Sequence, residues 1–156
     1  MKLYASWTHG NALTVQSPQV LSPNEVGHGG WGADYSVQPG QSSWFHIPIP
    51  TPVIVADVRS QFQKFFLLFE IPGGGRITEV HVYDGSGKIQ EFKGLSLSGA
   101  HRTQLDGANT FNLSSPHTVI WGIGITFAFT ADIGFDSPVP PSRLILGAAG
   151  ADFLAR

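Results

Sequence analysis

Short alternating or apolar runs, bounded by Gly, Pro, Asn and Ser, follow one another along the whole chain. This pattern is typical of antiparallel β-structure, because alternate residues of a strand face opposite sides of its sheet. No stretch longer than a few residues has the period of an amphipathic helix, and the best helical candidate is a single turn over 57–62. The runs predict strands over 2–8, 12–17, 31–37, 43–49, 53–58, 64–70, 77–83, 88–97, 109–113, 118–131 and 143–153.

The segment 118–131 has the clearest alternation in the chain. One face of the predicted strand is bulky, as expected of the side that faces the core, and the other face is small. A small face lets a second layer, a neighbouring subunit or a ligand approach closely, and packing within the fold is the commonest of the three. The bulky face carries Val119, Trp121, Ile123, Ile125, Phe127 and Phe129, and the small face carries Ile120, Gly122, Gly124, Thr126, Ala128 and Thr130.

Two other segments make specific local predictions. Residues 65–69 are apolar on both faces, which indicates a central strand that is covered on both sides. Residues 84–87 read Asp-Gly-Ser-Gly between two alternating runs. Because Asp and Gly tolerate the positive φ of a tight turn, this sequence predicts a β-hairpin.

Composition agrees with one all-β domain over residues 1–156. The chain is 42% hydrophobic and 13% charged, which is enough apolar material for one core and few charges for a surface. Two separate domains in 156 residues would each have a marginal core. About ten short strands therefore predict a single antiparallel β-sandwich of jelly-roll type, with a closed β-barrel as the alternative.

The charge pattern argues against a nucleic-acid partner. Nine Lys and Arg stand against eleven Asp and Glu, for a net charge of -2, and the basic residues are scattered along the chain. Nucleic-acid binding needs a concentrated basic surface. The chain has no cysteine, so disulfides, zinc–thiolate sites and thiol nucleophiles are excluded.

The amino terminus lacks the apolar stretch of a secretory signal, because Ser6, Thr8 and His9 interrupt it. The longest apolar run, 65–69, is too short to span a bilayer, so no membrane span is expected. We therefore expect the chain to be cytoplasmic, or released without a classical signal peptide. A mature form from which a signal has been removed is the alternative.

No catalytic or metal-binding motif stands out. The six histidines include no His-x-His pair and no His-Glu-x-x-His, and no Gly-x-Ser-x-Gly elbow occurs. Paired carboxylates of a glycosidase are an open alternative, since any two of the eleven acids can meet in space. We expect no metal, no cofactor and no enzymatic activity.

Aromatic and hydrogen-bonding residues gather instead in glycine-rich segments of the amino-terminal part. A sugar presents apolar C–H faces and many hydroxyls, so its binding needs an aromatic platform beside Asp, Asn or His. By their general preference, Trp7 and Trp44 fit the core better than a site, whereas Trp31 fits either. The candidate ligand-binding residues are His9, Asn11, His28, Trp31, Asp34 and Tyr35.

Three segments carry a resemblance to a known family: 5–11 (ASWTHGN), 44–52 (WFHIPIPTP) and 117–125 (HTVIWGIGI). They resemble a family of small bacterial β-rich proteins of unassigned function, over most of the chain. The resemblance implies no activity and no catalytic residues. The architecture is also similar, at the level of the fold, to small β-sandwich lectins.

Two functions fit these observations. The first is a non-enzymatic, lectin-like module that binds a glycan through the loop residues named above. The second is a structural or self-assembling protein whose β-sheets join subunits into homo-oligomers or filaments, because charged residues are too sparse to cover a lone domain comfortably.

Overall fold

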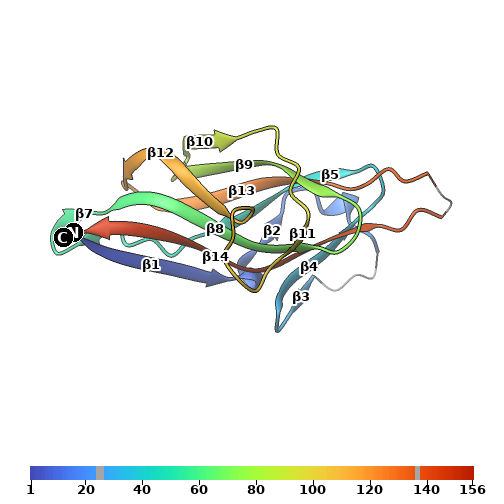
Figure 1. Cartoon of the computed structure of the whole chain (residues 1–156), viewed down its shortest axis with the longest axis horizontal. Helices are drawn as coiled ribbons and strands as arrows, with labels where there is room; N and C mark the ends of the chain where they lie inside the picture. The colour runs from blue at the N-terminus through green and yellow to red at the C-terminus, as the bar shows by residue number, and fades with distance from the viewer. Residues whose placement is uncertain (24–26, 136–137) are drawn as a thin grey trace.

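A computed structural model describes residues 1–23, 27–135 and 138–156 (Figure 1). It is built from antiparallel strands, with two short 3-10 turns, η1 (Gly10–Ala12) and η2 (Pro18–Val20). No helix in the described ranges is long and apolar enough to cross a membrane. The strands are β1 (Lys2–His9), β2 (Thr14–Val15), β3 (His28–Gly29), β4 (Gly32–Val37), β5 (Ser42–Pro48), β6 (Ile54–Val55), β7 (Val58–Arg59), β8 (Gln61–Ile71), β9 (Arg76–Asp84), β10 (Gly87–Phe92), β11 (Gly99–His101), β12 (Thr110–Thr118), β13 (Ile123–Thr130) and β14 (Ser142–Ala155).

The larger sheet has the order β11-β8-β14-β4-β3, with β1 also paired to β14 and β12 to β8. Its long strand β14 has β8 along one edge, while its other edge pairs first with β4 and then with β1. Figure 1 shows β1, β14 and β8 side by side, with both chain termini at one end of the molecule.

The smaller sheet has the order β10-β9-β13-β5-β2, and β6 and β7 form a separate hairpin. The described strands thus make two facing, curled sheets, and the predicted all-β antiparallel sandwich is confirmed. The prediction for 65–69 also holds: β8 lies between other strands, and only Leu68 of these five residues is more than slightly exposed.

The core lies between the two sheets and is rich in phenylalanine. Phe45 and Phe127 stack in the smaller sheet with ring centroids 5.8 Å apart, and Phe65 and Phe111 stack in the larger sheet at 4.9 Å. All four rings are buried. Burial of each such side chain contributes about 2 to 3 kcal/mol, so the two phenylalanine-rich faces dominate the stability of the sandwich.

The alternation of segment 118–131 correctly assigns most of its core face, but the strand is shorter than predicted. Ile123, Ile125, Phe127 and Phe129 are buried, whereas Trp121 is 75% exposed and precedes β13. The chain leaves the sheet here because the carboxylate of Asp84 accepts hydrogen bonds from the backbone amides of residues 120, 121 and 122. These amides are therefore not available to a strand ladder.

The two turn predictions have opposite outcomes. The hairpin at 84–87 is confirmed: Asp84 pairs with Gly87, and Gly85 has a φ of 59°. The helical turn at 57–62 is wrong. Ala56 and Asp57 have φ of 49° and 63° and form the tight turn between β6 and β7, after which β8 begins at Gln61.

Candidate binding site

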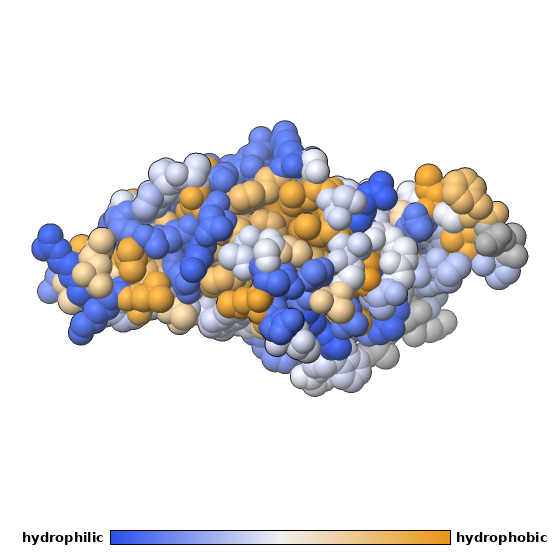
Figure 2. Space-filling view, viewed as in Figure 1, coloured by the Kyte–Doolittle hydropathy of each residue, from blue (hydrophilic) through white to orange (hydrophobic). Residues whose placement is uncertain are grey.

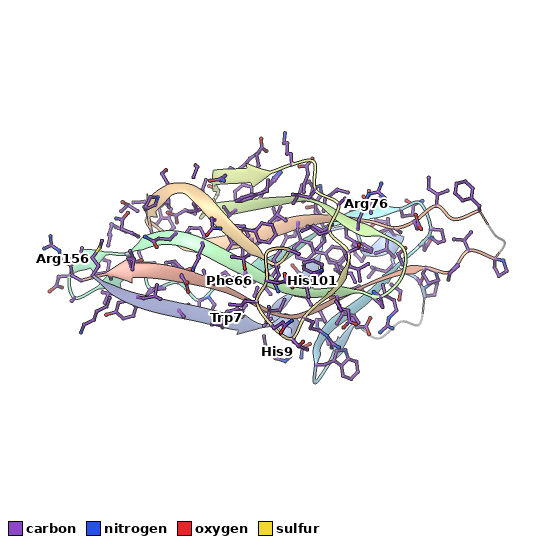
Figure 3. All side chains as sticks on the ribbon, in the orientation of Figure 1. Trp7, His9, Phe66, Arg76, His101 and Arg156 are labelled. Atoms are coloured by element: carbon purple, nitrogen blue, oxygen red, sulfur yellow. The ribbon has the colours of Figure 1, made fainter. Side chains whose placement is uncertain are left out.

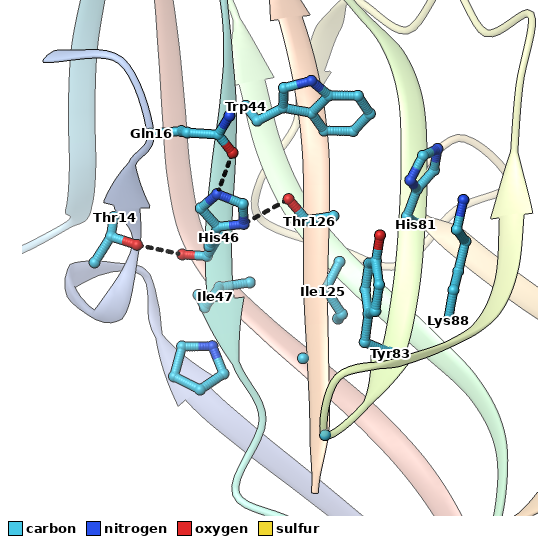
Figure 4. Close-up of a pocket in the computed structure, with 13 residues that line it drawn as sticks. Thr14, Gln16, Trp44, His46, Ile47, His81, Tyr83, Lys88, Ile125 and Thr126 are labelled. Atoms are coloured by element: carbon cyan, nitrogen blue, oxygen red, sulfur yellow. Dashed lines mark hydrogen bonds between the residues drawn. The ribbon is translucent and has the colours of Figure 1, made fainter.

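A groove of about 600 Å³ lies on the outer face of the smaller sheet (Figure 4). Its floor is the central strand β13, whose outward residues there are Gly124 and Thr126. The neighbouring strands β5 and β9 carry large outward side chains at the same level. Because a strand of small side chains runs between two strands of large ones, the face of the sheet is hollowed. The large side chains are Trp44 and His46 on β5 and His81 and Tyr83 on β9.

A row of polar groups crosses this groove from strand to strand. Thr126 stands opposite His46 on one side and opposite His81 on the other. His46 contacts the Thr126 hydroxyl through Nδ1 at 2.6 Å and the Gln16 side-chain oxygen through Nε2 at 2.9 Å. Burial lowers the pKa of His46, so its imidazole is neutral at neutral pH. These contacts fix the ring of His46 at the wall of the groove.

The aromatic part of the groove is formed by Trp44. Its ring lies 4.8 Å from that of His81, measured between centroids, with the planes at 50°. Figure 4 shows His81 and Tyr83 on the side of the groove opposite His46, with Trp44 at one end. Within the described residues, neither the Trp44 indole N–H nor the Tyr83 hydroxyl has a hydrogen-bond partner. Both are available to a ligand.

The charges beside the groove are paired with one another. Lys88 and Lys93 contact the two oxygens of Glu91 at 3.0 and 3.3 Å, and Glu79 accepts from His81 Nε2 at 2.8 Å. The hydrogen bond from Lys88 lowers the pKa of Glu91, and the same contact raises the pKa of Lys88. The formal charges of the two lysines and the two glutamates therefore cancel. A rim without net charge suits an uncharged polar ligand.

Four of the six residues predicted from the sequence meet elsewhere, beside η1. The Nε2 of His28 is hydrogen-bonded to the Tyr35 hydroxyl at 3.2 Å. The Nδ1 of the same ring lies 3.3 Å from the side-chain oxygen of Asn11. The side-chain amide of Asn11 donates a hydrogen bond to the backbone carbonyl of Gly29, and the Nε2 of His9 contacts the backbone carbonyl of Gly30. The cluster ties η1 to the β3–β4 turn, and much of its hydrogen-bonding capacity is used within the protein.

The other two predicted residues do not join this hydrogen-bonded cluster. Trp31 is 52% exposed at the β3–β4 turn and lies against Gly29. Asp34 and Tyr35 are neighbours in β4, so their side chains leave opposite faces of the sheet. Tyr35 joins the core, while Asp34 pairs with Arg143 at 2.6 Å. A ligand site made of all six residues stays a prediction.

The placement of two tryptophans in the core is wrong. Trp7 is 40% exposed and stacks on Phe66 at 5.3 Å on the outer face of the larger sheet (Figure 3). It lies over Gly150, where an added Cβ would come within 2.3 Å of the indole. Trp44 is half-buried and lines the groove. Along β5, Trp44 alternates with the buried residues Phe45 and Ile47 and therefore points outward. No residue of β1 is buried, and Trp7 packs over the face of the sheet on Phe66.

Sequence reasoning missed the groove residues on β5 and β9, although one signal for them was present. The small face of segment 118–131 is compatible with close packing, a subunit or a ligand, and the structure leaves open space over Gly124, whereas Thr126 is buried beside His46. A Cβ added at Gly124 meets nothing within 4 Å. In the described ranges, no three His, Asp or Glu side chains converge as they would around a metal ion.

The fold and the groove thus define the structural class of the protein: it is a β-sandwich in which the outer face of one sheet carries a hollow lined by aromatic side chains. The chain belongs to a family of unknown function (DUF6623), whose model matches residues 1–144. The expected membership of a family without an assigned function is therefore confirmed. No curated protein matches the chain in sequence.

Two solved structures resemble the fold distantly. One is the secreted serine protease VesC from Vibrio cholerae, with 12% identity, a TM-score of 0.37 and 81% of this chain covered. This chain spans 22% of the protease. The other is CBM35 from Paenibacillus barcinonensis, a carbohydrate-binding module, with 9% identity, a TM-score of 0.38 and full coverage of both chains.

Proposed function

We propose that the protein is a non-enzymatic binding module that holds a neutral glycan in the groove of the smaller sheet. The observation that carries this proposal is the combination of a half-buried tryptophan in the wall with a row of polar groups across one hollow of about 600 Å³. Apolar surface with a few convergent polar groups is the usual composition of a small-molecule site.

Each part of the groove has a role in this proposal. The ring of Trp44 packs against the apolar C–H face of a sugar, and its indole N–H donates to a hydroxyl. Tyr83 exchanges hydrogen bonds with sugar hydroxyls on the opposite side of the groove. Gly124 lets the sugar ring approach the backbone of β13, because no side chain stands there. Paired charges at the rim leave no net charge to attract an ionic ligand.

The test is a glycan array followed by isothermal titration calorimetry of the glycans that bind. Trp44→Ala should weaken binding by about tenfold or more, as expected for a central aromatic contact. Trp7→Ala is the matched control, because it removes an exposed tryptophan from the opposite sheet. An array without binding at high protein concentration, or equal loss in both variants while both stay folded, would overturn the proposal.

A second candidate function, self-assembly, is favoured by one observation. The described parts of the segment between β13 and β14 extend beyond the sheets and carry exposed apolar side chains (Figures 1 and 2). Ile133 is 74% exposed and Phe135 is fully exposed. Exposed apolar side chains favour association. Sedimentation of the intact protein and of the double variant Ile133→Ser, Phe135→Ser tests this, and a monomer at every concentration excludes it.

A further inference from the structure

A second hollow, of about 410 Å³, lies next to the groove at the open edge of the sandwich. It is bounded by β10, by the end of β12 and by the segment that carries Trp121. The two hollows adjoin at the β9–β10 turn: Lys88 lines both, and Gly85 lines the groove while it supports the indole of Trp121. A Cβ at Gly85 would come within 3.0 Å of that ring.

Trp121 is held in place although 75% of its surface is exposed. Asp84 accepts hydrogen bonds from the amides of Ile120, Trp121 and Gly122 at 2.7, 2.8 and 2.9 Å, so the backbone on both sides of the indole is fixed. The ring also rests on Gly85. An exposed aromatic side chain on a fixed backbone presents its face to a ligand with little loss of conformational entropy.

Polar side chains line the hollow beside this exposed ring. The Nε2 of His117 donates to Asp84 at 2.9 Å, because an ionised carboxylate can only accept, and its Nδ1 has no hydrogen-bond partner among the described residues. Gln90 accepts from the Ser114 amide and hydroxyl through its side-chain oxygen, and its Nε2 has no hydrogen-bond partner among the described residues. Two polar atoms, His117 Nδ1 and Gln90 Nε2, are thus available on side chains that line the same hollow as Trp121.

We infer that the hollow beside Trp121 is a second sugar subsite, so that the ligand is an oligosaccharide that extends from the groove around the β9–β10 turn. This inference rests on the proposed function of the groove. It assigns the groove and its Trp44 to one sugar unit and the Trp121 platform to another unit of the same chain. An oligosaccharide that is long enough to contact both tryptophans gains from the two contacts at once, so longer oligosaccharides bind more tightly than short ones.

The experiment is calorimetry with disaccharides and hexasaccharides of β-1,4-linked glucose, xylose and mannose. Trp121→Ala should weaken binding of the hexasaccharide by about tenfold and leave the disaccharide unchanged, whereas Trp44→Ala should weaken both. Phe135→Ala is the matched control, because it removes another exposed aromatic ring, one that lies in the connection between β13 and β14 and lines neither hollow. Trp121→Phe should retain most of the hexasaccharide affinity.

The alternative outcomes separate the two proposals. Equal affinity of Trp121→Ala and the intact protein at both lengths would overturn the second subsite and leave the groove. Loss of the disaccharide in Trp121→Ala but not in Trp44→Ala would overturn the groove as the main site. No binding of the intact protein to any of these sugars would overturn both. Circular dichroism and thermal melting confirm that each variant is folded.

Discussion

Trp44 on β5 and His81 on β9 meet across the intervening strand β13, with ring centroids 4.8 Å apart. The contact exists because Ala128, the β13 residue opposite Trp44, is too small to separate the two rings. The same small face continues through Thr126 to Gly124, where the groove is open. The shape of the groove therefore depends on which side chains β13 lacks.

Filling the floor of the groove should remove binding without loss of stability. Gly124 lies in β13, its φ is not among the positive values, and a Cβ there meets nothing within 4 Å. Gly124→Val should therefore fit the strand and hold or raise the melting temperature, because β-branched residues favour strands. It should weaken glycan binding by about tenfold or more, because its methyl groups occupy the space of the ligand.

The control for this substitution is Gly107→Val, which also places a side chain where an added Cβ meets nothing, but in the connection between β11 and β12. Binding and stability are measured by calorimetry and by thermal melting. Full affinity in Gly124→Val would show that the ligand does not occupy the groove.

The site predicted from the sequence, which includes Trp31, competes with the groove, and one variant distinguishes the two. Trp31 is exposed and makes few contacts besides the one with Gly29, so Trp31→Ala should change stability by less than about 1 kcal/mol. If the groove is the binding site, Trp31→Ala binds glycan with the affinity of the intact protein in calorimetry. Loss of binding in Trp31→Ala, with Trp44→Ala unaffected, would favour the site predicted from the sequence.

Local patterns in the sequence were enough to predict the all-β class and most strands. The alternation over 77–83 and 88–92 and the Asp-Gly turn between them determine a hairpin without any other part of the chain. The large and small faces of 123–130 also follow from period two alone. Strand order does not, because pairing of β13 with both β5 and β9 joins segments that no local pattern relates.

The groove could not be predicted for the same reason. His46, Thr126 and His81 form one cross-strand row, yet they come from three strands far apart in the chain. Trp121 shows a second limit. Its position continues the apolar alternation of 123–129, but Asp84 takes the amides of its segment from 36 to 38 positions away. A hydrogen bond between distant residues leaves no mark on local periodicity.

The Asp84 carboxylate should be one of the main stabilising polar groups of the molecule. It is buried and serves three backbone amides and His117. Asp84→Ala leaves these donors without their acceptor and should cost about 2 to 4 kcal/mol in urea unfolding. Asp84→Asn retains one acceptor oxygen and should cost about half as much. A cost below about 1 kcal/mol for Asp84→Ala would mean that water replaces the carboxylate.

The same carboxylate should give the protein a measurable acid dependence. Burial alone would raise the pKa of Asp84, but the hydrogen bonds from His117 and from the amides of residues 120–122 outweigh it and lower the pKa from 3.8 to about 2. The ionised form is therefore favoured in the folded state. Its contribution is complete above the unfolded pKa and is lost as the pH falls through the folded pKa.

The gap between these two pKa values corresponds to about 2 kcal/mol. Urea unfolding of the intact protein, followed from neutral pH down to about pH 2, should show this loss mostly below about pH 4. Asp84→Asn has no carboxylate at this position, so the difference in unfolding free energy between the two proteins should shrink over the same interval. Parallel curves for the two proteins would mean that Asp84 titrates alike in the folded and unfolded chains, and that its four hydrogen bonds do not favour the ionised form.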